Sequence, residues 1–405
     1  MSKKTFTILI LALVVIVGVF AFFYFSYVKP AAPTTQTTPT TNDDLFPFGN
    51  GGGGQQTGGG SGASAASTTK ALPPRLRQLS LNPLAGVASL TRDSKTHFRY
   101  IERATGHIFE TPADSLDITR ITNTTVPKIY EAQWGVGAGS ILLRYLKDDE
   151  ETINTFYASF GSASTTQTAN LNGTFLAPNI GSTVFSPLGT SIAYTVTHAG
   201  ASLYTADTEA LKPKLIFVSP LREWLLLWPE KNTLTLTTRA SAGVDGFMYA
   251  ISPTTGASRK ILSSVKGLTT LMSPDGKKVL YAGNENGSIE LHLLTISGNV
   301  DVGVPFTTLP EKCVWSEKSS NLIFCAVPKN FLDSTLPDTW YQGKVSFDDA
   351  LWSYDTITGT TVRLLDPSTY SQSFDMVAPS LSANENFILF INKKNLLGWT
   401  YKLTP

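Results

Sequence analysis

A polar turn followed by an apolar strand recurs at a nearly constant interval along most of this 405-residue chain. The interval constrains the fold more than any other feature of the sequence. The turns that carry the pattern start at Ser186, Trp228, Ser273, Ser316 and Ser382, with spacings of 42, 45, 43 and 66 residues. Three intervals agree, and the fourth equals one period plus an insertion of roughly 20 residues. A long-range period of this size indicates a stack or ring of repeated supersecondary units.

The residues between the turns have the alternation of half-buried strands. Ile192, Tyr194 and Val196 share one face of a strand, and a second turn and hairpin follow each of the first four repeats. A period near 43 with four short strands matches one blade of a β-propeller. With two weaker units before the series, we expect an all-β propeller of about seven four-stranded blades, although six or eight remain possible. The segment Arg75–Leu81 is expected to complete the last blade and close the ring.

The repeat also resembles a known family. The run SPDGKKVLYAG, which begins at Ser273, and the run ELHLLTISG, which begins at Glu290, are similar to the TolB-like or WD40-like propeller repeats of bacterial proteins. The resemblance implies a blade and no particular activity. Members of the family include periplasmic scaffolds that dock other proteins and the propellers of some peptidases.

The N-terminal region predicts a membrane anchor. Residues 5–28 (TFTILILALVVIVGVFAFFYFSYV) carry no charge, and as a helix they would reach roughly 36 Å, which exceeds a hydrocarbon core of about 30 Å. Lys3 and Lys4 precede the span and Lys29 follows it, so the positive-inside rule places residues 1–4 in the cytoplasm and the rest outside, in the periplasm or at the cell surface. A cleaved signal peptide is the alternative.

Residues 29–70 are Pro/Thr-rich and then Gly-rich, and too few of them are apolar to form a core. We expect a disordered linker that holds a propeller of residues 71–405 away from the bilayer. The net charge of +1 and the lack of a long basic run argue against a nucleic-acid partner. The propeller is expected to be monomeric.

The two cysteines, Cys313 and Cys325, flank a turn centred on Ser319. If the two flanking strands pair symmetrically, the cysteines lie opposite each other, with Cβ atoms about 4.5–5.5 Å apart. An extracytoplasmic compartment favours disulfides. The sequence therefore predicts a Cys313–Cys325 disulfide, with two buried thiols as the alternative.

Motifs with a defined chemistry are missing from the sequence. It contains no HExxH, GxSxG, Walker-type loop or EF-hand loop, and none of its four histidines has a close histidine neighbour. We therefore expect no catalytic residues recognisable from sequence, no metal site and no cofactor.

The insertion in the sixth unit, from Pro328 to Ala350, is the best binding candidate in the sequence. It falls between the second and third strands of its blade, and such loops emerge on the face of a propeller that commonly binds partners. Its aromatic and polar residues would supply the contacts; they are Asp338, Trp340, Tyr341, Gln342, Phe347 and Asp348. In the alternative interpretation the segment folds over a neighbouring blade and buries its own rings.

Two functions fit these observations. The first is a membrane-tethered, non-catalytic module that docks an envelope protein or a cell-envelope polysaccharide. The second is an extracytoplasmic hydrolase or lyase that acts on glycans or peptides through carboxylates contributed by different blades. Paired carboxylates about 5–9.5 Å apart in an aromatic-lined central pocket would favour the enzyme.

Overall fold

The computed structural model describes residues 72–404, except 161–170, 210, 286 and 332–334. These residues belong to one compact unit, Thr68–Pro405. The predicted anchor (5–28) and linker (29–70) lie outside the described residues. Within the described part of the chain, no helix is both long enough and apolar enough to cross a membrane.

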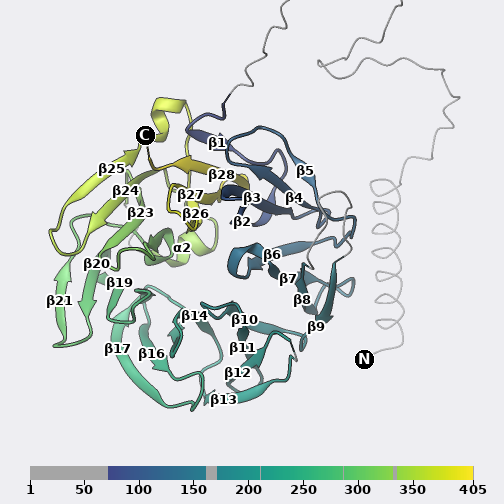
Figure 1. Cartoon of the computed structure of the whole chain (residues 1–405). Helices are drawn as coiled ribbons and strands as arrows, with labels where there is room; N and C mark the ends of the chain where they lie inside the picture. The colour runs from purple at the N-terminus through teal and green to yellow at the C-terminus, as the bar shows by residue number, and fades with distance from the viewer. Residues whose placement is uncertain (1–71, 161–170, 210, 286, 332–334, 405) are drawn as a thin grey trace, which may run out of the picture. The chain divides into compact units, whose positions relative to one another are not determined.

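The described residues form seven four-stranded antiparallel sheets arranged as the blades of a ring (Figure 1). The predicted all-β propeller and its blade number are therefore confirmed. Blades one to three are β2 (Leu84–Arg92), β3 (Lys95–Glu102), β4 (Ile108–Pro112) and β5 (Thr119–Arg120); β6 (Ile129–Trp134), β7 (Ser140–Leu146), β8 (Ile153–Ser159) and β9 (Asn172–Phe175); and β10 (Ile180–Phe185), β11 (Ser191–Thr197), β12 (Ala201–Asp207) and β13 (Lys214–Ser219).

Blades four to six follow the same order, from the innermost strand outward. They are β14 (Trp224–Glu230), β15 (Thr233–Thr238), β16 (Asp245–Ile251) and β17 (Ser258–Lys266); β18 (Thr269–Met272), β19 (Lys278–Glu285), β20 (Ser288–Thr295) and β21 (Val300–Gly303); and β22 (Cys313–Trp315), β23 (Leu322–Pro328), β24 (Asp349–Asp355) and β25 (Thr361–Leu365). The short helices are η1 (Val136–Ala138), η2 (Pro310–Lys312), α2 (Asp338–Tyr341) and η3 (Pro367–Tyr370).

The seventh blade joins the two ends of the propeller. Its strands β26 (Met376–Leu381), β27 (Phe387–Asn392) and β28 (Leu397–Lys402) come from the C-terminal end, and β1 (Leu76–Gln78) adds the outer strand. Leu76 pairs with Tyr401, and both are buried together with Leu79, which is 1% exposed. The prediction that Arg75–Leu81 closes the ring is therefore confirmed.

The recurring serine has a structural role in the turn between the first two strands of a blade. The Ser273 hydroxyl accepts a hydrogen bond from the Lys278 amide at 3.0 Å and donates one to Asp275 at 2.6 Å. Ser186 and Ser382 accept the corresponding amide hydrogen bond five residues ahead. Because each hydroxyl satisfies an amide that the tight turn leaves without a strand partner, the same residue type occurs at this place in blades three, five and seven.

The cysteines occupy the first two strands of blade six. Cys313 in β22 lies directly opposite Cys325 in β23, with Cα atoms 4.1 Å apart, and the two form a disulfide. The pairing predicted from the symmetric hairpin is therefore confirmed. The disulfide belongs to a hydrophobic cluster that joins blades five and six and includes Leu291, Trp315 and Trp340.

Candidate functional site

The segment between β23 and β24, residues 329–348, is called the inserted segment. It leaves blade six at the end of the second strand, and the innermost strands begin at that same end of the ring. We call this side of the propeller the insertion face. In Figure 1 the helix α2 of the inserted segment lies inside the ring of blades, toward its centre.

The aromatic residues of the inserted segment are directed into the protein. Trp340 and Phe347 are 4% and 3% exposed, and their rings stack with centroids 6.0 Å apart. Tyr341 is half-buried, and its hydroxyl donates a hydrogen bond to Glu311 of η2. The rings of Trp340 and Phe347 are buried, as in the alternative interpretation of the inserted segment. A binding role for these residues stays a prediction.

The three polar residues of the prediction have separate surroundings. Asp338 accepts a hydrogen bond from the Ala242 amide of blade four at 2.6 Å, which fastens α2 across the ring. Gln342 is exposed, and its backbone N–H caps the C-terminal end of α2 by donating to the carbonyls of Asp338 and Trp340. Asp348 is partly exposed and accepts a hydrogen bond from Ser373 at 3.0 Å. The structure therefore does not bring these three side chains together as one polar surface.

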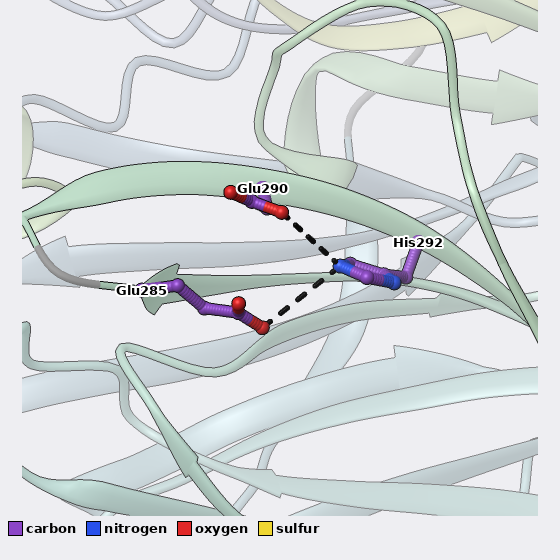
Figure 2. A group of neighbouring side chains, drawn as sticks. All are labelled: Glu285, Glu290 and His292. Carbon is purple, nitrogen blue, oxygen red and sulfur yellow. Dashed lines mark ion pairs between the residues drawn. The ribbon is translucent and has the colours of Figure 1, made fainter.

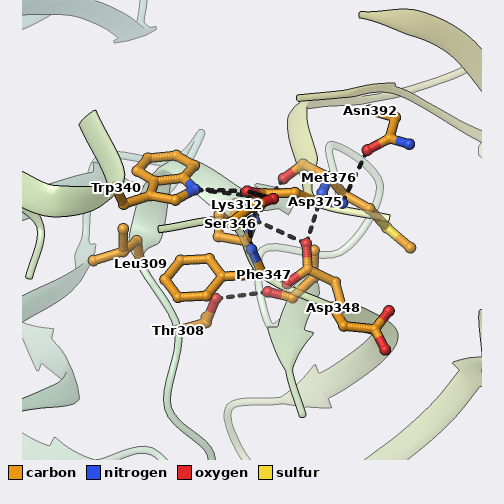
Figure 3. Close-up of polar contacts among 12 residues, drawn as sticks. Thr308, Leu309, Lys312, Trp340, Ser346, Phe347, Asp348, Asp375, Met376 and Asn392 are labelled. Atoms are coloured by element: carbon orange, nitrogen blue, oxygen red, sulfur yellow. Dashed lines mark hydrogen bonds and ion pairs between the residues drawn. The ribbon is translucent and has the colours of Figure 1, made fainter. Parts of the chain in front are cut away.

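A buried ionic network lies beneath α2 (Figure 3). The Lys312 ammonium is 2.6 Å from Asp375 Oδ1 and 2.8 Å from Asp349 Oδ2, and all three side chains are 0% exposed. The indole N–H of Trp340 donates to both oxygens of Asp375, at 3.0 and 3.2 Å. Charges in a closed interior require such partners, because an unpaired ion there loses its hydration without compensation.

Burial dominates the pKa values around this network. It raises the pKa of Asp349 to about 6, against the opposing effect of the Lys312 charge. Burial also raises the pKa of Glu311, and burial together with the Glu311 charge raises that of Tyr341. Burial lowers the pKa of Lys393, whose ammonium lies 4.2 Å from the centroid of the Trp340 ring. Lys393 contacts α2 through the Trp340 ring, and Glu311 contacts it through the Tyr341 hydroxyl.

A pocket of about 520 Å³ is present on the insertion face, where β10 and β14 begin. Residues from blades two, three and four line it; they include Glu131, Arg144, Thr195, Arg222, Glu223, Trp224 and Arg239. The charge of Arg144 is paired with that of Glu131, whose carboxylate is 2.6 Å away. Arg239 is 62% exposed, and its guanidinium group is 3.9 Å from the Glu223 carboxylate. Arg239 lies three residues before Ala242, whose amide donates to Asp338 of the inserted segment, so one wall of the pocket leads into the loop that contacts this segment.

Among the residues that the structure describes, one group of side chains could hold a metal ion. Glu285, Glu290 and His292 converge at the end of the β19–β20 hairpin, and both carboxylates are 3.9 Å from His292 Nε2 (Figure 2). The opposite nitrogen of the ring lies 3.5 Å from Asp301. We assign no metal to this group, because both glutamates are more than half exposed and carboxylates at such a surface are ordinarily solvated.

Sequence reasoning missed the buried network, the pocket and the histidine group. The pocket combines residues from three blades, so no local spacing reveals it. The histidine group had a local signal: Glu290 and His292 are two residues apart on one strand face, and Glu285 lies across the Asn-Gly turn.

No family model matches the sequence, and no protein in the curated collections matches it either. Solved structures do match the fold. An oligogalacturonate lyase in complex with manganese is 12% identical, with a TM-score of 0.55 over 81% of this chain and 93% of the other. The β-propeller domain of the Trilobed protease from Pyrococcus furiosus is 11% identical, with a TM-score of 0.52 over 80% and 98% of the two chains. TolB from Acinetobacter baumannii is 14% identical, with a TM-score of 0.43 over 66% and 63%.

At these identities the likeness concerns the fold alone. The first two structures are a lyase and the propeller domain of a protease, so the shared architecture does not select a function for this chain.

Proposed function

We propose that this chain is a membrane-tethered, extracytoplasmic β-propeller that docks an envelope protein, without catalysis, on its insertion face. The tether is the anchor predicted from residues 5–28. The Cys313–Cys325 disulfide supports the compartment, because disulfides persist in oxidising environments and are rare in the cytosol.

The observation that carries the docking function is the pairing of the polar groups on this face. Asp338 is bonded to Ala242, and Tyr341 to Glu311, so α2 is held as a fixed part of the surface. The carboxylates that meet beneath it, Asp349 and Asp375, are 0% exposed and closed to a substrate. A rigid surface of this kind suits recognition, since a partner that binds it has little loop ordering to overcome.

The arginine-lined pocket is the open feature that a partner would enter. Arg222 is exposed, and Arg239 has only an exposed, distant ion pair with Glu223, which contributes little stability. Both guanidinium groups can therefore turn to a carboxylate of a partner, with Trp224 as the apolar base of the pocket. An acidic segment of an envelope protein is the partner that this charge pattern fits.

The hydrolase or lyase function would require an accessible acid–base pair. Of the two carboxylates of the pocket, Glu131 is held as an anion by Arg144 at 2.6 Å, and Glu223 is 70% exposed and solvated, so neither is a buried acid. This arrangement supports binding over acid–base chemistry.

The test uses the propeller, residues 72–405, which contains every described strand including the closing strand β1. The immobilised domain is incubated with an envelope protein fraction, and retained proteins are compared between variants. We expect a partner that binds the wild type and is lost from the double variant Arg222→Glu/Arg239→Glu, with weaker capture at higher salt. Arg259→Glu/Lys260→Glu, at two exposed positions on the outer strand β17 of blade four, changes the net charge by the same amount and is the matched control. Equal capture by the double variant would reject the pocket as the docking site.

A further inference from the structure

The buried network beneath α2 holds more negative than positive charge. Lys312 is the ammonium that contacts both Asp349 and Asp375, and none of the three side chains is exposed. A closed interior disfavours this excess, since water cannot solvate the second carboxylate. Joining the ammonium to one carboxylate would remove two charges that a closed interior disfavours, and would leave the Asp375 anion with its donors from Trp340, Ser346 and Phe347.

The two carboxylates differ in how well they are stabilised as anions. Asp375 accepts hydrogen bonds from the Trp340 indole, from the Phe347 amide at 3.1 Å and from the Ser346 hydroxyl at 3.3 Å. Asp349 accepts one from the Met376 amide at 2.6 Å through Oδ2, while its buried Oδ1 has no partner among the described residues. Burial raises the pKa of Asp349 to about 6. Asp349 is therefore the carboxyl group that most readily becomes a neutral acid, and a neutral acid is the better electrophile.

The nucleophile is already in place. The Lys312 nitrogen is 2.8 Å from Asp349 Oδ2, within reach of the carboxyl carbon bonded to that oxygen. It lies 5.1 Å from the centroid of Trp340 and 5.2 Å from that of Phe347, so aromatic rings close the site to solvent. Because the fold holds the amine and the carboxyl group side by side, they do not need to meet by diffusion. Because the site excludes water, it favours a reaction that releases a water molecule.

We propose that Lys312 Nζ and the side-chain carbonyl carbon of Asp349 form an intramolecular amide bond, with Asp375 carrying the proton. This modification site is independent of the docking function proposed above. The bond would join η2 to the first residue of β24, immediately after the inserted segment. With the neighbouring Cys313–Cys325 disulfide, blade six would then have two covalent links on the insertion face.

The atoms of the step balance without an external reagent. The Lys312 ammonium passes a proton to the Asp349 carboxylate, which leaves an amine and a carboxylic acid. The amine nitrogen attacks the carboxyl carbon, and the new C–N bond forms. Asp375 takes a proton from the nitrogen and delivers it to the departing hydroxyl group as the C–O bond breaks. One ammonium and one carboxylate become one amide and one water molecule, and Asp375 is unchanged.

The test is peptide mapping by mass spectrometry on the purified full-length chain, after the disulfide has been reduced and alkylated. We expect a branched peptide that joins the segments around Lys312 and Asp349, lighter by one water molecule than the two linear peptides together. Lys95 and Asp114 provide the internal control, because their charged atoms are 2.9 Å apart but 64% and 52% exposed. That pair should give only linear peptides.

The wild-type measurement does not depend on the folding of any variant. Unmodified linear peptides covering Lys312 and Asp349 in the wild type would overturn the proposal. Lys312→Arg and Asp349→Ala should each abolish the branched peptide, and its persistence in either would show that other residues are joined. Asp375→Asn retains both reacting groups and should slow the appearance of the link after refolding; an unchanged rate would remove Asp375 from the mechanism.

Discussion

The indole N–H of Trp340 offers a quantitative test of the buried network, because the indole N–H groups of two other buried tryptophans, Trp228 and Trp399, have different surroundings. In Trp340→Phe, a donor is withdrawn from the Asp375 carboxylate, which is 0% exposed. Hydrogen bonds to charged groups contribute about 1.5–3 kcal/mol to stability. The Trp228 indole donates at 3.3 Å to the Lys231 carbonyl, a neutral acceptor, and such bonds contribute about 0.5–1.5 kcal/mol.

The third member of the series is Trp399, which is 7% exposed and whose indole N–H has no acceptor among the described residues. All three Trp→Phe changes remove the same ring volume. The differences between their losses in free energy of unfolding therefore report the hydrogen bond of the indole. Urea unfolding followed by circular dichroism should rank the losses in free energy of unfolding as Trp340, then Trp228, then Trp399, with about 1–2 kcal/mol between the first two. A loss at Trp340 no larger than that at Trp228 would refute the charged network as a source of stability.

Three further outcomes follow from the fold. Replacing Cys313 and Cys325 by alanine should lower the free energy of unfolding by about 3 kcal/mol, because the link spans 12 positions; a similar stability with and without reductant in the wild type would contradict this. Leu79→Ala should cost about 2–5 kcal/mol by opening a cavity where the ring closes, against less than about 0.5 kcal/mol for Leu81→Ala, which is 90% exposed. Burial raises the pKa of Tyr100 to about 12, so its contribution to stability is complete below the unfolded pKa of about 10 and is lost as the pH rises toward 12; ultraviolet titration should show that Tyr100→Phe removes one late-ionising group.

The fold could be predicted from the sequence because its determinants are local and repeated. Ser273 and Ser382 make the same hydrogen bond in the turns of blades five and seven, so the blade period can be recognised in the sequence. The disulfide followed from a symmetric hairpin, since equal distances from a turn place Cys313 opposite Cys325. Ring closure followed from counting strands in the last unit.

The candidate site could not be predicted because its residues are brought together by the ring. Lys312 precedes blade six, Asp349 begins its third strand, and Asp375 precedes blade seven. Charged residues in such loops are ordinarily solvated, and nothing in the local pattern marks these as buried. The sequence also does not determine whether Trp340 is buried, because an aromatic residue in an insertion suits a binding surface and a buried core equally well. The deciding fact is the presence of Asp375 as a partner for its indole.

The most direct test of the docking face compares two leucines in the full-length chain. Leu225 lines the arginine pocket at the beginning of β14 and is 37% exposed; Leu188, 61% exposed, lies in the turn after β10 at the opposite end of the ring. Each position is replaced in turn by a photo-crosslinking amino acid, and the cells that make the protein are irradiated. A discrete crosslinked envelope protein from position 225, with none from 188, is the result predicted for docking on the insertion face. Crosslinks from 188 with none from 225 would contradict it.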